Sequence, residues 1–453
     1  MNFQDIIKNL PEVKKPTEKR LGFNVKLKWT LIILVSFFVL ANISLYGLAE
    51  NALQRFEYLA IILGTDFGSI ISLGIGPIVM ASIILQLLVG SKILNIDTTS
   101  EEGKRYFSGL QKLLVFFFII FEAIVYVLMK GLQAAPGLAW LVIFQLILGG
   151  LVIVFMDEVS QKWGFGSGVS LFIAAGVGWR LFTGAFQFIG PEGTIEFSGK
   201  IPVLIVSIMS GASDEAFKAF ATLLATIIIF LVIVWAQSLK IEVPLSFDRL
   251  RGYGIKWPLN FFYASVIPVI LTAALVANLQ LFGGLLQSWL GHPTFLGTFS
   301  QGRAISGLAF WLGAHNLVES SITGSLRGIF LLQGLTHIVF YMLFATIFSI
   351  FWVKTSGMDA SNQAHNIISS GLQIPGFRKD ERVLESVLKR YVMPLTVMGG
   401  AAIGLLAATS DLLGTLTSGT ALLLGIMIIF QFYQNIAQQH AVDMHPAMKK
   451  FIE

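Results

Sequence analysis

The stretch LGIGPIVMASIILQLLVG, residues 73–90, contains no charged residue. Its length and apolar character are those of a membrane span. Its first turn nevertheless includes Gly74, Gly76 and Pro77, and in a helix interior glycine costs about 1 kcal/mol and proline about 3 kcal/mol. The sequence therefore predicts a membrane helix that begins at a break in its own backbone.

The composition of the whole chain agrees with a membrane location. Of 453 residues, 55% are hydrophobic and 13% are charged, and the mean hydropathy is +0.77. These values indicate a polytopic membrane protein. The chain has no cysteine, its six histidines show no metal-ligand spacing, and no nucleotide-binding loop is present. We therefore expect no metal, no cofactor and no catalytic residues.

Ten apolar runs are long enough to cross a bilayer. Ten spans can form two halves of five, and because five is odd, two halves of similar fold must be inverted relative to each other. No sequence repeat is readable, so the inversion rests on the number of spans. We expect an all-α polytopic membrane protein with ten transmembrane helices in two inverted halves, at about 28–48, 73–90, 110–130, 137–156, 168–188, 217–239, 259–282, 328–353, 392–409 and 414–435.

The distribution of positive charge predicts the orientation. Most of the 31 lysines and arginines fall in segments that would face one side of the membrane. The positive-inside rule assigns that side, and both termini, to the cytoplasm. Only seven remain for the other side or for helix ends: Arg55, Lys130, Arg180, Lys200, Lys218, Arg303 and Arg327.

The predicted order along the chain is symmetric about an external hinge. Residues 1–27 form a cytoplasmic N-terminus in which Phe3, Ile6, Ile7 and Leu10 suggest a surface helix that Pro11 ends. The apolar pieces 201–209 and 306–314 are too short to span. The predicted segments are the N-terminal half at 28–188, the hinge at 189–216, the C-terminal half at 217–435 and a cytoplasmic tail at 436–453.

Few polar side chains are expected inside the membrane. Glu122 is the only carboxylate that we place well inside a span, where it is either a structural hydrogen-bonding group or a proton site. His337 fits a hydrogen-bonded histidine between helices better than a metal ligand. Ion-coupled transporters usually carry more intramembrane charge, so an ion-coupled secondary transporter is the alternative class.

Two basic loops lie on the predicted cytoplasmic side, within residues 240–258 and 354–391. The first carries Arg249 and Arg251 on a turn-rich stretch, and the second carries Arg378 and Lys379 behind Pro375. Such loops suit an acidic partner, which could be RNA, anionic lipid or an acidic protein. Lysines and arginines beside helix ends can equally be ordinary membrane anchors.

Five motifs in this order resemble the SecY family, which forms the large subunit of the protein-conducting translocon. The similarity extends over the whole chain and points to the archaeal branch, which is similar to the eukaryotic alpha subunit. The motifs are SLGIGPIVMASIILQLLVG (72–90), GFGSGVSLFIAAG (164–176), NFFYASVIPVILTAALVANLQL (260–281), GFRK (376–379) and LKRYVMPLTVMGG (388–400).

The resemblance implies a central pore closed by two devices. Residues 56–70 match a plug half-helix that precedes the membrane-crossing part of the second span. The plug residues would be Phe56, Tyr58, Leu59, Ile61, Ile62, Thr65 and Phe67. The pore ring, which resists passage of water and ions because aliphatic groups offer them no partner, would be Ile75, Val79, Val169, Ile173, Ile270 and Leu424.

The resemblance also implies a gate and partners. Glu122 and Asn278 match polar positions of a lateral gate, where a hydrogen bond would hold the closed seam, although Met80 replaces a polar residue at one corner. Arg249, Arg251, Arg378 and Lys379 would bind the ribosome. Further expected partners are SecE-type and small beta-type membrane subunits, signal sequences, nascent polypeptides and membrane lipid, with no role for DNA. We expect a non-enzymatic channel in the plasma membrane.

Overall fold

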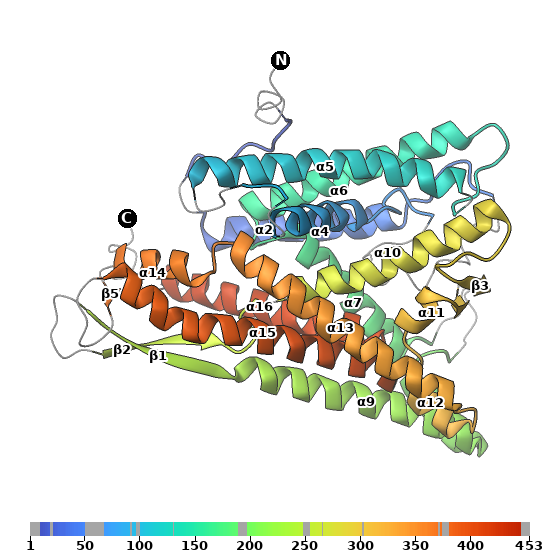
Figure 1. Cartoon of the computed structure of the whole chain (residues 1–453). Coiled ribbons are helices and arrows are strands. Elements are labelled where there is room, and N and C mark those ends of the chain that lie inside the picture. Colours follow the sequence, from blue (N-terminus) through green and yellow to red (C-terminus); the bar gives the residue numbers. More distant parts are fainter. Residues whose placement is uncertain are drawn as a thin grey trace.

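The structure is a computed structural model of the whole chain (Figure 1). In the first half of the chain, the structure describes residues 10–18, 21–49, 68–90, 93–96, 100–129 and 131–188. In the second half of the chain, the structure describes residues 197–247, 254–264, 266–300, 303–369, 372–373 and 380–444.

Ten apolar helices form the body of the described protein, as predicted. Nine are long and apolar enough to cross a membrane, and α4 is apolar but shorter. The first half consists of α2 (Phe23–Ala41), α4 (Gly76–Gly90), α5 (Glu101–Leu128), α6 (Ala139–Trp163) and α7 (Gly168–Phe186). The second half consists of α9 (Ser213–Ser238), α10 (Ile267–Leu290), α13 (Gly328–Thr355), α15 (Glu381–Leu413) and α16 (Gly419–Met444).

Short elements connect these helices. Of the two apolar pieces predicted to be too short to span, 201–209 lies within helix α8 (Lys200–Ser210), and 306–314 contains helix α11 (Leu308–Leu312). The remaining short helices are α12 (Leu317–Ile322) and α14 (Ala360–Ser369), and the strands are β1 (Lys240–Phe247), β2 (Gly254–Asn260), β3 (Thr298–Ser300), β4 (Arg303–Ser306) and β5 (Leu372–Gln373).

Segment 240–258, predicted as a basic connection between two spans, contains two strands. β1 and β2 form an antiparallel hairpin, and Lys256 pairs with Glu242 across it. Pro258 lies in β2, an edge strand in which a missing N–H is tolerated, and Pro244 lies in β1 before the two residues that pair with β5. The turn residues that suggested a loop belong to the segment between the strands.

The two halves form two groups in space. Figure 1 shows α2, α4, α5 and α6 above the helices of the second half, with α7, α10 and α16 where the groups meet. α7 contacts α16 on one side, whereas α4 contacts α10 and α13 on the other. The chain itself joins the halves only through the α7–α8–α9 connection, so the α4–α13 contact has no covalent link across it.

The break before α4 is buried inside the protein. Ile71, Ser72 and Leu73 are fully buried, and Gly74 has a φ of +53° that favours glycine. The Ser72 hydroxyl accepts a hydrogen bond from the Gly68 N–H at 2.7 Å and donates one to the Ser69 carbonyl at 2.6 Å. Irregular backbone is tolerated at membrane depth when protein surrounds it and satisfies its polar groups.

Helix α6 makes room for this segment with two adjacent glycines. A Cβ added at Gly149 would lie 1.8 Å from the Ile70 carbonyl oxygen. A Cβ at Gly150 would lie 2.9 Å from a side-chain carbon of Ile119 and 3.2 Å from one of Leu73. The backbone of residues 70–73 therefore approaches α6 more closely than any side chain at Gly149 would allow.

A repeated carboxylate cap supports the inversion of the halves. Asp157, near the end of α6, accepts a hydrogen bond at 3.0 Å from the Val169 N–H in the first turn of α7. Asp411, near the end of α15, accepts one at 2.8 Å from the Thr420 N–H in the first turn of α16. The motifs Ser-Gly-Val (167–169) and Ser-Gly-Thr (418–420) occupy the same place in both halves.

The serines of these motifs also act alike. Ser167 accepts a hydrogen bond from the N–H of Ser170, and Ser418 accepts one from the N–H of Ala421, so each serves the residue three positions on. The fourth and fifth helices of each half thus share a junction that three residues define. No repeat was readable from the sequence because only these few positions keep it.

The described part of the N-terminus lies across the ends of α5 and α6. The Val13 N–H donates to Glu158 at 2.9 Å, and Lys162 donates to Glu12 at 2.5 Å and to the Val13 carbonyl at 2.7 Å. The hydrogen bond from Lys162 lowers the pKa of Glu12. The predicted surface helix lies almost entirely outside the described residues, which begin at Leu10.

The glycine contact generates a stability prediction. Gly149→Ala should lower the thermal unfolding temperature, because its Cβ would overlap the Ile70 carbonyl and overpacking costs about 1–3 kcal/mol. Gly176→Ala in α7 is the matched control, since nothing lies within 4 Å of its Cβ and alanine favours the helix by about 1 kcal/mol. Unfolding of the detergent-solubilised protein, followed by tryptophan fluorescence, measures both. Equal unfolding temperatures would contradict the close approach.

Candidate pore and gate

Six aliphatic side chains from four helices belong to one apolar core. Five of them are less than 9% exposed, and Val169 packs against the same cluster as a partly buried side chain. This core contains side chains from both halves of the protein. These six residues, named the collar below, are Ile75 and Val79 at the start of α4, Val169 and Ile173 of α7, Ile270 of α10 and Leu424 of α16.

The helix starts explain how the collar residues reach the centre. Ile75 precedes Pro77, which lies in the first turn of α4, and Ile270 follows Pro268, which lies in the first turn of α10. Proline fits the first turn of a helix because its missing N–H has no partner there. Both prolines fix where a helix begins next to the apolar core, and α4 contacts α10, which contacts α16, which contacts α7.

The chemistry of the collar is that of a barrier. Its side chains offer no hydrogen-bond donor or acceptor, so a narrow opening among them resists wetting and the passage of ions. A stacked pair of rings, Phe37 of α2 and Phe172 of α7 with centroids 4.7 Å apart, extends the apolar core on one side. In this structure the six collar side chains pack into one apolar core.

The two predicted gate residues are buried, but the predicted hydrogen bond between them is absent. Glu122 of α5 is fully buried and Asn278 of α10 is 3% exposed. Asn278 Nδ2 donates to the Ala274 carbonyl of its own helix at 2.8 Å. Neither oxygen of Glu122, nor Asn278 Oδ1, has a hydrogen-bond partner among the described residues. The Ala274 carbonyl therefore pairs with the amide nitrogen of Asn278 and leaves its oxygen without a partner.

A different polar contact joins α4 to α5. Gln111 Nε2 donates to Ser82 Oγ at 2.7 Å, and Ser82 in turn donates to the Ile78 carbonyl at 2.8 Å. Gln111 was not among the residues singled out from the sequence. The signal was available in part, because a glutamine in an apolar helix needs a partner.

Three polar side chains of α13, Gln333, Thr336 and His337, bond to the short helix α11 and its C-terminal end. Gln333 Nε2 donates to the carbonyls of Phe310 at 2.8 Å and Gly313 at 3.1 Å, and Thr336 donates to that of Trp311 at 3.0 Å. These residues recur every three or four positions and so share one helix face. They bond carbonyls at the C-terminal end of α11, of which that of Phe310 also accepts from the Gly313 N–H.

His337 completes this face and confirms its reading as a histidine between helices. Its Nδ1 lies 2.7 Å from the Leu312 carbonyl oxygen, and its Nε2 lies 3.5 Å from a carboxylate oxygen of Asp411. The described residues contain no group of three or more acidic, histidine or cysteine side chains that could hold a metal ion.

Glu122 is not the only largely buried carboxylate among the described residues. Asp157 and Asp411 are also largely buried, because α6 and α15 extend further than the predicted spans. Both carboxylates cap the following helix, and this structural use explains their burial. Their signal in the sequence was weak, since each falls just beyond an apolar run.

The basic segments are joined by one small sheet. Its strand order is β2-β1-β5, and Ser246 and Phe247 of β1 pair with Gln373 and Leu372 of β5. The sheet rests on a second apolar cluster that includes Val243, Leu259 and Leu388. Tyr263 donates to the Met358 carbonyl at 2.6 Å, and burial raises the pKa of Tyr263 to about 12.

Several predicted site residues lie outside the described residues. They are the plug residues Phe56, Tyr58, Leu59, Ile61, Ile62, Thr65 and Phe67 and the basic residues Arg249, Arg251, Arg378 and Lys379. The described neighbours locate where these segments attach. The plug segment ends at the buried break before α4, and the basic segments leave the ends of β1 and β5.

Ten helices around an apolar constriction, with an unlinked seam between the halves, define a polytopic membrane protein of the channel class. The SecY family profile matches residues 69–433. The chain is 44% identical to the protein translocase subunit SecY of Methanothermobacter thermautotrophicus and 38% identical to that of Methanocaldococcus jannaschii, with at least 98% of each chain covered. The chain therefore belongs to the SecY family.

Solved structures agree with the family. One described as a protein-conducting channel has a TM-score of 0.84 and 36% identity, and covers 99% of both chains. Sec61 in the canine ribosome–channel complex has a TM-score of 0.81 and 35% identity, again with 99% of both chains covered.

The unpaired gate groups generate a prediction for membrane insertion. Asn278→Leu should raise the hydrophobicity that a test helix needs for insertion, because it replaces a buried unpaired oxygen by an apolar contact at the seam. Polar contacts within membranes contribute about 0.6 kcal/mol and each leucine about 0.5 kcal/mol, so the threshold should rise by about one to two leucines. A graded series of leucine–alanine helices measures it.

Thr396→Val is the matched control for this experiment. Thr396 is a buried residue of α15 whose hydroxyl donates to the Val392 carbonyl of its own helix at 2.7 Å. It should leave the threshold unchanged. An unchanged threshold in Asn278→Leu would remove Asn278 from the gate and leave Glu122 as a candidate proton site.

Proposed function

We propose that this chain is the pore-forming subunit of a Sec-type protein translocase. It would conduct unfolded polypeptides across the membrane and release apolar segments sideways into lipid. The observation that carries the proposal is the collar, in which aliphatic side chains from both halves share one core. An extended polypeptide can fill such a collar with its own atoms, and the aliphatic lining selects for no particular side chain.

Residues 56–70 would act as a plug that blocks the pore beside the collar. The attachment of this segment supports the role, because the described chain emerges from it as a buried turn that leads directly to Ile75. In a solved relative with 36% identity, the plug domain of SecY stabilises the closed state of the translocation channel and maintains a membrane seal.

The lateral exit would open between α4 and α13. A Cβ at Gly90 would lie 2.5 Å from the Phe351 ring, so the two helices touch closely at one end of the seam. The α7–α8–α9 connection joins the halves away from this contact and would serve as the hinge. Glu122 and Asn278 would set how readily the seam opens.

Arg249, Arg251, Arg378 and Lys379 would bind the ribosome through its RNA phosphates. The common sheet of β1, β2 and β5 supports a single docking platform, since both basic segments begin at its strands. SecE-type and beta-type subunits, signal sequences and nascent chains would complete the working channel. The chain would lie in the plasma membrane with both termini in the cytoplasm and would have no catalytic activity of its own.

The collar generates a test of conduction. Replacing Val79 and Ile173 with asparagine should let water enter the constriction, because each change adds hydrogen-bonding groups where there were none. Deleting residues 58–66 in the same chain should remove the second barrier and raise ion conductance in planar bilayers. The control is Val142→Asn with the same deletion, since Val142 of α6 is fully buried in a cluster apart from the collar. Wild-type conductance in the combined variant would contradict a pore.

Docking is tested by charge reversal. Arg378→Glu should weaken ribosome binding severalfold and reduce its salt dependence, because each phosphate contact contributes about one unit to the slope of log affinity against log salt. Arg382→Glu is the control, since Arg382 lies exposed in the first turn of α15 just beyond the basic segment. Co-sedimentation with ribosomes at several salt concentrations measures both. Unchanged affinity in Arg378→Glu and in the Arg249→Glu/Arg251→Glu pair would refute the platform.

A further inference from the structure

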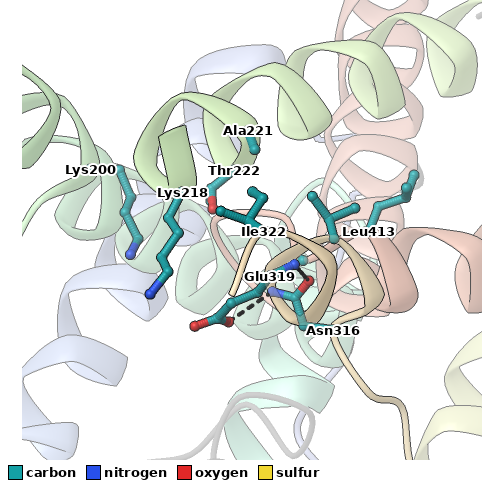
Figure 2. A pocket seen from close by; sticks show the side chains of 10 residues that line it. Lys200, Lys218, Ala221, Thr222, Asn316, Glu319, Ile322 and Leu413 are labelled. Carbon is teal, nitrogen blue, oxygen red and sulfur yellow. Dashed lines mark hydrogen bonds between the residues drawn. The ribbon is translucent and has the colours of Figure 1, made fainter. Parts of the chain in front are cut away.

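A pocket outside the pore opens at the end of the bundle opposite the β1–β2 hairpin. It lies between α8, α9, α12 and the end of α15 (Figure 2). Its cavity volume is about 60 Å³, which is several times the roughly 15 Å³ that one water molecule needs. Ala221, Ile322 and Leu413 form apolar walls. The pocket can therefore hold a small polar group with an apolar surrounding.

Two lysines from different helices line this pocket. Lys200 is the first residue of α8, and Lys218 lies in the second turn of α9. Both are half-buried, and Figure 2 shows both ammonium groups directed to the same open side. No hydrogen bond or ion pair joins either lysine to another described residue. Two neighbouring cations repel each other, so an anion between them would stabilise the pair.

The third charged side chain of the pocket is held in place opposite the lysines. Glu319 Oε2 accepts a hydrogen bond from Asn316 Nδ2 at 3.1 Å, and the Glu319 N–H donates to Asn316 Oδ1 at 3.0 Å. Its carboxylate faces the opening some way from the lysines (Figure 2). The pocket thus combines two cations with one anion and retains a net positive charge.

An apolar stripe runs along α9 next to the pocket. The pocket-lining residues of α9 are Lys218, Ala221 and Thr222, and the adjacent face carries Phe217, Phe220 and Leu224. The last three are 65%, 51% and 43% exposed, and they belong to a helix long enough to cross a membrane, so this face can contact lipid. Lysines at the end of such a helix place their charge at the level of the lipid head groups.

We propose that this pocket binds the phosphate of a membrane lipid head group, with the lipid chains lying on the Phe217–Phe220–Leu224 stripe. Lys200 and Lys218 hold the phosphate. Glu319 faces the outer part of the head group, where it accepts a hydrogen bond from a hydroxyl or an amine. The apolar stripe favours a lipid over a free phosphate ion, because a free ion would gain nothing from it.

Native mass spectrometry of the delipidated translocase complex, titrated with dioleoylphosphatidylglycerol, tests the proposal. Lys200→Gln/Lys218→Gln should weaken binding of the tightest lipid about 30-fold, the effect of two lysines near a charged membrane surface. Glu319→Gln should strengthen it, because the pocket then loses its negative charge. Arg327→Gln is the control, since Arg327 is exposed at the start of α13 and does not line the pocket.

Two further ligands separate the possible sources of the phosphate. Dioleoylglycerol, which lacks a phosphate, should bind no differently to wild type and to the double lysine variant. Inorganic phosphate at millimolar concentration should not displace the lipid, and displacement would overturn the assignment to a lipid. Equal lipid binding by the double variant and Arg327→Gln would refute the site. Loss of a protein subunit from the double variant, with unchanged lipid binding, would instead assign the lysines to a protein carboxylate.

Discussion

The bilayer core contains no water, so every backbone polar group at membrane depth needs a partner within the protein. This constraint applies most strongly to the break before α4, where the backbone is buried but not helical. The Ser72 hydroxyl bonds the backbone of Gly68 and Ser69 just before it, and the glycines of α6 let the segment pack closely against that helix. Because the break lies inside the bundle, α4 starts within the core, and its first residues can line a central constriction.

The same constraint explains the repeated aspartate cap. A helix that begins within or near the membrane has N–H groups without intrahelical partners, and a carboxylate from the preceding helix is a strong acceptor for them. Asp157 and Asp411 supply it in the two halves. Inverted halves keep this junction because each must turn its fourth helix back into its fifth, whereas the lipid-facing residues between are free to diverge.

Some buried polar side chains are hydrogen-bonded to a neighbouring element, whereas others have atoms without a partner among the described residues. The polar face of α13, from Gln333 to His337, is bonded to the carbonyls of α11 and fixes that helix against α13. Glu122 and Asn278 are buried with oxygens that have no partner among the described residues. An unpaired buried oxygen costs free energy, so Glu122 and Asn278 stabilise their surroundings less than the bonded face of α13 does.

The sequence by itself determined the ten helices, the two apolar pieces too short to cross the membrane, the family and the aliphatic nature of the collar, because apolar length and motif order are local properties. The partners of the polar side chains were decided only by the tertiary structure. Asn278 bonds its own helix instead of Glu122, Gln111 reaches Ser82, and Asp411 lies within reach of His337. The collar is likewise a product of packing: its residues are ordinary aliphatics until four helices, two of them started by proline, bring them into one core.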